Sequence, residues 1–348
     1  MIAPQSVQVG PEIIRLVAEL EEFKGAWNVM GRLTPERLSA LKRIATIESI
    51  ASSTRLEGAT LTDREVEALL SNRQATSFAS RDQREVAGYA AVLELVFSSW
   101  SAMPLTENHI RQLHRDLLRH SDQDARYRGR YRTMPNGIAA FDKEGQRLDV
   151  PFETASPFDI PRHMTELTGW LTDAQGGGQL HPPLRIGLWL GMFLAIHPFQ
   201  DGNGRVSRVL AALLLLQAGY SYVPYSSLER IVEHHKDAYN LVVRRTQRAA
   251  WSDTPDWQPW LHFFLKALAE QTRRLGQSLE QEQRLDSLPT MSLQIMDVLE
   301  ARRRATMGEI ITLTGGKRDT IKSHLRTLVE QARLLRHGRG RGVWYQLP

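Results

Sequence analysis

The segment from His197 to Arg208, with the sequence HPFQDGNGRVSR, carries side chains that suit a chain of phosphates. Its Gly-Asn-Gly turn can point successive backbone N–H groups at one anion, and a helix beginning there adds unpaired N–H groups and a favourable dipole. Arg205 and Arg208 are three residues apart, so on that helix both guanidinium groups face one side. The segment predicts a triphosphate-binding site.

Two further side chains in this segment suit group transfer. Asp201 can bind the hard divalent cation that a triphosphate usually carries. His197 precedes the glycine-rich turn and is the residue here best suited to accept a proton near neutral pH. The plain alternative is a glycine-rich helix start with solvated arginines.

The segment resembles, position for position, the Fic-family pattern His-x-Phe-x-Asp/Glu-Gly-Asn-Gly-Arg-x-x-Arg. The resemblance implies a mainly helical protein that moves AMP from ATP to a protein hydroxyl. It also implies that His197 is the general base, that Asp201 is the Mg2+ ligand and that Phe199 is a buried anchor of the loop.

The same resemblance assigns the phosphate-binding residues. It implies that Asn203 and the backbone amides of Gly202 and Gly204 hold the α- and β-phosphates. Arg205 would pair with the phosphates beside the metal ion, and Arg208 would orient the γ-phosphate.

A second segment, from Ser53 to Gly58, resembles the Ser/Thr-x-x-x-Glu-Gly/Asn pattern of the inhibitory helix in autoinhibited Fic proteins. We expect a helix from Thr34 into this motif, ended by Gly58. Glu57 at its end is disfavoured by the helix dipole and needs a cationic partner. The resemblance implies that this partner is Arg208, so that Glu57 occupies the γ-phosphate site; a solvated Glu57 is the alternative.

Composition and charge limit the class of protein. The chain of 348 residues is long enough for two or three domains, contains no cysteine and has no apolar run long enough to span a bilayer. We therefore expect a cytoplasmic protein without a membrane segment. From Leu285 onward there are eleven Lys or Arg against six Asp or Glu, and this excess of five equals the net charge of the whole chain.

The basic C-terminal region has an order of elements that resembles a winged helix-turn-helix. Apolar periodicity predicts three helices, followed by two strands on either side of the basic loop His337–Gly342. In such a fold Lys317, Arg318, Thr320 and Ser323 would begin the recognition helix, and DNA would be the partner. A winged helix that binds protein or forms a homodimer is the alternative.

A lapse in the helical pattern predicts a β-hairpin from residues 137–141 and 147–150. Fic proteins have such a flap, which pairs with the target backbone, so we expect an extended target segment to dock here. A plain surface loop is the alternative.

These observations predict a mainly α protein with a Fic-type helical core, a small β-hairpin flap and a C-terminal winged helix-turn-helix. The expected regions are an inhibitory N-terminal region (1–100), a catalytic core (101–270) and the winged helix (285–348). The expected function is autoinhibited transfer of AMP from ATP, with Mg2+, to a Ser, Thr or Tyr hydroxyl of a target protein or of the protein itself. Two alternatives stay open: an ATP-sensing DNA-binding regulator, and a Fic enzyme that uses another nucleotide donor or removes AMP.

Overall fold

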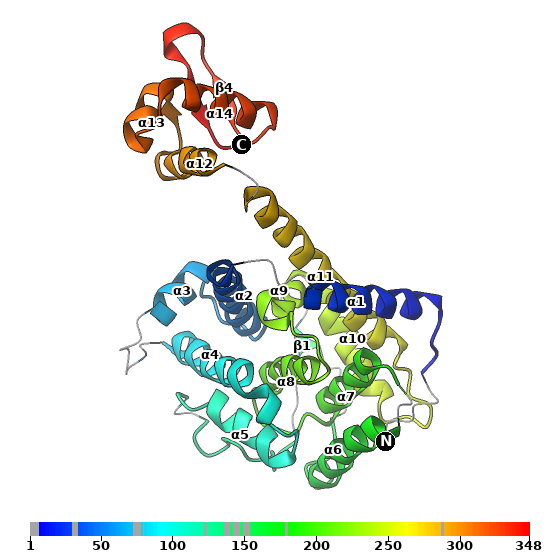
Figure 1. Ribbon diagram of the computed structural model, residues 1–348. Coiled ribbons are helices and arrows are strands. Elements are labelled where there is room, and N and C mark those ends of the chain that lie inside the picture. Colours follow the sequence, from blue (N-terminus) through cyan, green and yellow to red (C-terminus); the bar gives the residue numbers. More distant parts are fainter. Residues whose placement is uncertain are drawn as a thin grey trace. The chain divides into compact units, whose positions relative to one another are not determined.

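The computed structural model describes residues 7–29, 34–71, 78, 80–121, 124–135, 140–141, 147–148, 154–177, 180–286 and 289–348. These residues are mainly helical, as predicted, and the chain separates into two compact units, Met1–Leu275 and Gly276–Pro348 (Figure 1). None of the described helices combines the length and the apolar character that a membrane span requires.

The first unit is a helical bundle with two short 3-10 turns. Its elements are α1 (Pro11–Val29), α2 (Pro35–Leu56), α3 (Asp63–Ser71), α4 (Arg81–Ser99), η2 (Trp100–Ala102), α5 (Glu107–Leu117), α6 (Ile160–Gly177), α7 (Pro182–Ile196), α8 (Asn203–Gln217), η3 (Val223–Tyr225), α9 (Leu228–His234), α10 (Lys236–Ala249) and α11 (Gln258–Asp286). The last of these helices continues into the second unit.

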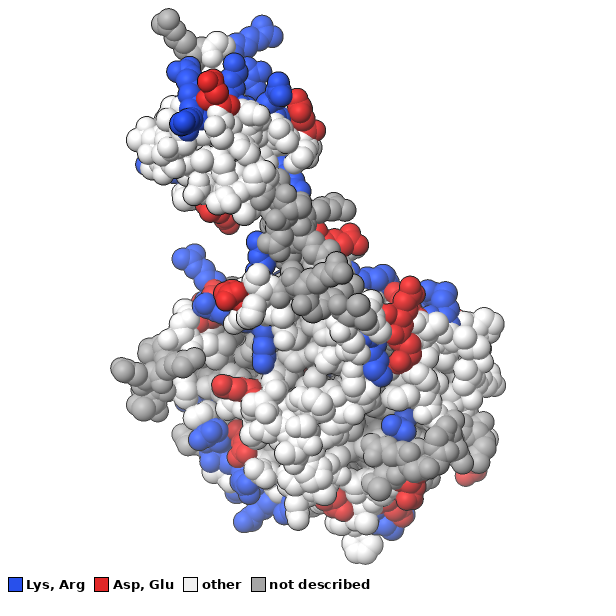
Figure 2. Space-filling model, viewed as in Figure 1, with Lys and Arg blue, Asp and Glu red and all other residues white. Residues whose placement is uncertain are grey.

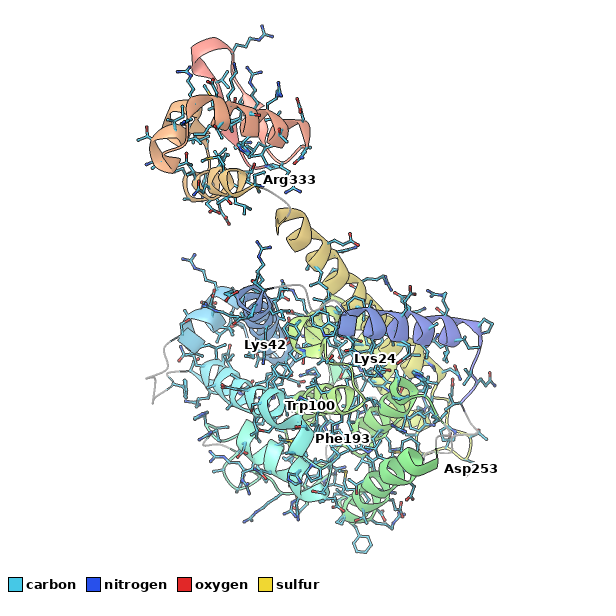
Figure 3. All side chains as sticks on the ribbon, viewed as in Figure 1. Lys24, Lys42, Trp100, Phe193, Asp253 and Arg333 are labelled. Atoms are coloured by element: carbon cyan, nitrogen blue, oxygen red, sulfur yellow. The ribbon has the colours of Figure 1, made fainter. Side chains whose placement is uncertain are left out.

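Helices α7 and α8 form the buried centre of this bundle. From Pro183 to Ile196 all but one residue of α7 are buried, and α8 is buried along most of its length. Phe193, labelled in Figure 3, is 0% exposed within the helices. Because nearly every residue of both helices is buried, other parts of the bundle must surround them. The chain between them, residues 197–202, is therefore held at both ends by the core.

Helix α2 connects the N-terminal region to the rest of the bundle. It packs against α4, α8, α9 and η3, and its second half is buried from Ser49 to Thr54. Helix α2 belongs to the predicted region 1–100, whereas α8 and α9 belong to the predicted region 101–270. Because α2 packs against both, the two regions form one compact unit. The end of α2 consequently lies inside the unit rather than at its edge.

A short hairpin lies between α5 and α6 in the sequence. Strand β1 (Ala140–Phe141) pairs antiparallel with β2 (Arg147–Leu148), with Ala140 opposite Leu148 and Phe141 opposite Arg147. The other residues of the predicted hairpin, 137–139, 142–146 and 149–150, lie outside the described residues.

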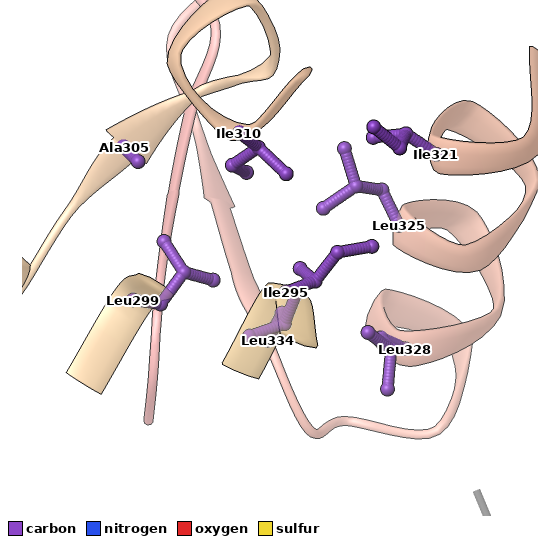
Figure 4. Close-up of a cluster of buried hydrophobic side chains, with 8 residues drawn as sticks. All are labelled: Ile295, Leu299, Ala305, Ile310, Ile321, Leu325, Leu328 and Leu334. Carbon is purple, nitrogen blue, oxygen red and sulfur yellow. The ribbon is translucent and has the colours of Figure 1, made fainter. Parts of the chain in front are cut away.

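The second unit combines three helices with a three-stranded sheet. It contains α12 (Thr290–Arg302), β3 (Ala305–Thr306), α13 (Met307–Thr314), α14 (Arg318–Glu330), β4 (Leu335–His337), η4 (Gly340–Gly342) and β5 (Trp344–Gln346), and the antiparallel sheet has the order β3-β5-β4. Its core consists of Ile295, Leu299, Ala305, Ile310, Ile321, Leu325, Leu328 and Leu334 (Figure 4). The structure adds β3 and η4 to the elements predicted from the sequence.

Gly88 permits the close approach of α4 to α5. A Cβ atom at Gly88 would overlap the backbone carbonyl of Leu117. We therefore expect Gly88→Ala to lower the free energy of unfolding by about 1–3 kcal/mol, because neither helix backbone can move freely. Gly169→Ala in α6 is the matched control: no atom lies within 4 Å of the added methyl group, so helix propensity should raise stability by about 0.5–1 kcal/mol. Urea unfolding of both variants tests this, and equal stability changes would contradict the tight contact.

Candidate active site

The loop between α7 and α8 has a constrained backbone. His197 caps α7 in the left-handed conformation, with φ 52° and ψ 61°, and its N–H donates to the Phe193 carbonyl at 3.0 Å. Gly202 has φ 80° and directly precedes α8. A left-handed histidine is uncommon, and such conformations concentrate at functional sites. The two helices thus present His197 and the α8 N-terminus on either side of one short loop.

Asn203 closes this loop with its side chain. Its Oδ1 accepts from the Phe199 N–H at 2.9 Å, and its Nδ2 donates to the Phe199 carbonyl at 2.8 Å. The side chain is 2% exposed, and its amide group is engaged by the loop. These two bonds satisfy backbone groups of Phe199, as a six-residue loop between buried helices requires. Asn203 and the backbone amides of Gly202 and Gly204 stay the predicted phosphate-binding groups.

Phe199, which belongs to the loop, stacks on the buried ring of His114 in α5. Phe199 is 0% exposed and stacks on the His114 ring, with centroids 3.8 Å apart and planes 4° apart. His114 Nδ1 accepts from the Gly129 N–H at 2.9 Å, so Nε2 carries the proton and donates to the Asp201 carbonyl at 3.0 Å. Burial lowers the pKa of His114 to about 4. The sequence did not identify His114 as part of the site, because one histidine on a helix face does not reveal its partners.

Arg205 lies between two carboxylates. Its Nη2 donates to Asp201 Oδ2 at 2.9 Å, and its Nη1 lies 3.3 Å from Glu85 Oε2. Arg205 is 1% exposed, so its positive charge requires nearby negative charge. Glu85 comes from α4 and was also not identified from the sequence, since only the fold brings it to Arg205.

Asp201 is the member of this group that solvent can reach. Its side chain is 40% exposed, although one oxygen accepts from Arg205. Among the described residues, no group of three or more His, Asp or Glu could hold a metal ion by itself. One accessible carboxylate fits Mg2+, which is often bound through a single carboxylate together with substrate phosphates and water.

Arg208 is the buried partner of the N-terminal motif. Its Nε donates to Ser53 Oγ at 2.8 Å, and its Nη2 donates to the Ser53 carbonyl at 3.0 Å and to Glu57 Oε1 at 2.7 Å. Burial favours a lower pKa for Arg208, but the charge of Glu57 outweighs it and raises the pKa. The structure thus brings together Ser53, Glu57 and Arg208 from two helices far apart in the sequence.

The Glu57 carboxylate also lies against the first turn of α8. A Cβ atom at Gly204 would overlap Glu57 Oε1, which shows how closely the carboxylate approaches that backbone. Gly58, with φ 101°, turns the chain away directly after Glu57. An anionic group thus lies at a helix N-terminus, where backbone N–H groups and the helix dipole favour negative charge.

Arg55 provides a second attachment for the end of α2. Its Nη2 donates to Glu233 Oε2 on α9 at 2.9 Å, and its Nη1 donates to Asp63 Oδ1 on α3 at 2.9 Å. These contacts lie two residues from Glu57 and do not involve Arg208. They restrict the position of Glu57 independently of its own ion pair.

The imidazole of His197 is partly buried and uncharged at neutral pH. Burial, and then the charge of Arg132, lower the pKa of His197 to about 4. Arg132 Nε also donates to the His197 carbonyl at 2.8 Å. The imidazole is therefore neutral at pH 7, in the protonation state needed to accept a proton.

Part of the chain matches a known protein family. Residues 104–215 match the Fic/DOC family, so the chain contains a Fic domain, and the site described above lies in and around it. The chain is similar to "Protein adenylyltransferase Fic" of Drosophila grimshawi, with 29% identity over 223 residues, covering 64% of this chain and 43% of the relative. The corresponding protein of Drosophila mojavensis is 28% identical, with 64% and 41% covered. The chain thus spans about two fifths of the length of these curated relatives.

Solved structures show the same fold. A Fic family protein from Desulfovibrio desulfuricans G20 superposes with a TM-score of 0.60 at 23% identity, covering 100% of this chain and 98% of that one. A Fic domain containing signaling protein from Bacteroides thetaiotaomicron gives a TM-score of 0.59 at 26% identity, covering 74% of this chain and 95% of that one.

The buried histidines predict a pH-dependent stability. The pKa of His114 falls from 6.5 in an unfolded chain to about 4 on folding. The stability that its neutral form contributes is present above pH 6.5 and is lost as the pH falls towards 4. We expect the urea-unfolding free energy to decrease over this window, and to decrease less steeply in His114→Gln. Identical slopes for the two proteins would contradict the shifted pKa.

Proposed function

We propose that this protein is an autoinhibited protein adenylyltransferase. It would transfer AMP from ATP to a Ser, Thr or Tyr hydroxyl of a target protein or of itself, with release of pyrophosphate. One observation carries the proposal: a neutral His197 ends α7 directly before a loop and helix N-terminus that gather Asp201, Arg205 and Arg208. The similarity to proteins named adenylyltransferases supports it.

The proposed transfer begins with proton removal by His197. Nδ1 of this residue is buried, so Nε2 is the atom that accepts the proton of the target hydroxyl. The hydroxyl oxygen then forms a bond to the α-phosphorus, and the bond from that phosphorus to pyrophosphate breaks. General-base catalysis of this kind contributes about 10²–10⁴-fold to the rate.

The remaining groups of the site would bind and orient ATP. The amides of Gly202 and Gly204 and the guanidinium groups of Arg205 and Arg208 would hold the phosphates. Mg2+ bound at Asp201 would neutralise phosphate charge. A triphosphate beside His197 would raise the pKa of its imidazole and so make it a stronger base.

The position of Glu57 supports the proposed autoinhibition. Its carboxylate takes the Arg208 Nη2 donor at 2.7 Å and lies against the first turn of α8. A γ-phosphate would need the same guanidinium and the same space, and two anions there would repel one another. ATP that binds beside Glu57 would therefore present its α-phosphorus in an unproductive orientation.

Removing the carboxylate should release the activity. We expect Glu57→Gly to raise AMP incorporation into the protein by about 10- to 100-fold, the range that corresponds to one charge-assisted hydrogen bond. Adding His197→Ala should abolish incorporation while leaving ATP affinity largely unchanged. Intact-mass spectrometry after incubation with MgATP measures this, and parallel incubations with GTP, CTP and UTP test the nucleotide preference.

Glu22→Gly, which removes an exposed glutamate of α1, is the matched control and should behave as the wild type. If Glu57→Gly is silent while Arg208→Ala abolishes ATP binding, the inhibitory role of Glu57 is wrong. If ATP binding is lost in folded His197→Ala, the base assignment is wrong.

A second function, DNA binding by the C-terminal unit, is favoured by the charge on α14. Arg318, Lys322 and Arg326 follow one another at intervals of four residues and are exposed, so they lie along one side of the helix. Ile321, Leu325 and Leu328 of the same helix belong to the core. Lys and Arg side chains gather on this unit in Figure 2. We infer a winged helix-turn-helix whose basic helix and loop contact the phosphates of duplex DNA.

Salt dependence tests this second function. We expect binding of a fluorescent DNA duplex to weaken steeply as salt is added, with the logarithmic slope changing by about 0.9 for each phosphate contact. Lys322→Ala should reduce that slope by about one unit. Arg64→Ala, an exposed arginine of α3, is the control and should leave it unchanged. Absence of binding at low salt would contradict a DNA-binding role.

A further inference from the structure

Arg132 uses one buried guanidinium to hold three separate stretches of backbone. It is 3% exposed. Its Nε donates to the His197 carbonyl at 2.8 Å, and its Nη1 donates to the Met134 carbonyl at 3.1 Å. Its Nη2 donates to Thr154 Oγ1 at 3.0 Å and also to the Ala155 carbonyl. Its own backbone N–H donates to the Pro198 carbonyl at 2.9 Å.

Three of the residues that Arg132 contacts lie on either side of the hairpin in the sequence. Met134 lies before strand β1, and Thr154 and Ala155 lie after strand β2. The chain entering the hairpin and the chain leaving it are thus bonded to the same side chain, which is also bonded to the backbone of His197. Arg132 thus joins the backbone of His197 to the segments that precede and follow the hairpin in the sequence.

The chemistry of these acceptors argues for a positional role. Among the described residues, the Arg132 guanidinium donates to three carbonyl oxygens and one hydroxyl oxygen, and to no carboxylate. Burial lowers the pKa of Arg132, which reflects the cost of a buried cation. A flat, five-donor guanidinium can bond several fixed oxygens at once, whereas a lysine ammonium cannot reproduce that fork.

We propose that Arg132 is a positioning residue for the transfer. It fixes the backbone of His197 relative to the segments that precede and follow the β1–β2 hairpin in the sequence. This rests on the proposed function, because it assumes that His197 is the base, and on the expectation from the sequence that the target backbone docks on the hairpin. The left-handed backbone of His197, with φ 52°, is a conformation that surrounding contacts must maintain. The hydrogen bond to its carbonyl is such a contact.

The test uses Glu57→Gly as the parent and compares four proteins. Arg132→Lys keeps the charge and loses the fork, while Thr154→Val removes one acceptor and preserves side-chain shape. Arg130→Ala, an exposed arginine two residues away, is the matched control. The rate of AMP incorporation into each protein is measured across MgATP concentrations, which separates the maximal rate from the concentration that gives half of it.

We expect Arg132→Lys to lower the maximal rate by about 10- to 100-fold, since small misplacements of reacting groups have effects of that size. Thr154→Val should lower it by about three-fold, as for one neutral hydrogen bond. The MgATP concentration at half-maximal rate should stay unchanged in both, and Arg130→Ala should match the parent. A maximal rate in Arg132→Lys equal to that of the parent would overturn the proposal. If Arg132→Lys fails to fold, a parental rate in Thr154→Val would overturn it.

Native-state hydrogen exchange gives a readout that needs no activity. The amide at position 132, which donates to Pro198, should exchange about ten-fold faster in Arg132→Lys and measurably faster in Thr154→Val, while the Trp189 amide inside α7 stays unchanged. If the Glu57→Gly parent incorporates no AMP, transfer to the protein itself is wrong and the rates give no comparison. Exchange then decides the connection between His197 and the hairpin: unchanged exchange at position 132 would overturn it.

Discussion

The ion pair between Arg208 and Glu57 is the interaction on which the arrangement of the site depends. Arg208 is 7% exposed on a helix buried along most of its length, and a charge in that position requires a partner. Glu57 and Ser53, at the end of α2, supply it. The same guanidinium can therefore stabilise the packing of the N-terminal region or bind an anionic ligand. Under the proposed function, the γ-phosphate of ATP would compete with Glu57 for it, so stability and inhibition would share one contact.

Buried polar side chains also hold the loop between α7 and α8. Asn203, His114 and Arg132 each bond backbone atoms of residues 197–201, and each is buried. A short loop between two buried helices cannot rely on water for its backbone hydrogen bonds, so side chains provide them. These hydrogen bonds restrict the loop backbone, which the proposed proton removal and phosphate binding would require of their supports. Polar side chains that bind no ligand are therefore as necessary here as those proposed to bind one.

The second unit differs from the first in its core and in its charge. Its eight-residue apolar core is made entirely from residues 295–334, none of which belongs to the segment that matches the Fic/DOC family. Its charge is also separate, since the excess of Lys and Arg over Asp and Glu from Leu285 onward equals that of the whole chain. A neutral domain with buried, paired charges and a basic domain with exposed ones present two surfaces with different preferences for partners.

The sequence by itself determined the local features: the helical class, the buried α7–α8 pair, the hairpin strands and the Fic motif. These follow from periodicity and from the chemistry of neighbouring residues, which are properties of short segments. Tertiary structure alone decided which groups meet. It placed Glu85 beside Arg205, His114 beneath Phe199, and Arg132 between His197 and the hairpin. It also placed the Asn203 side chain in hydrogen bonds with the loop backbone at Phe199. No spacing rule could show this, because each partner comes from a distant element or competes with another acceptor.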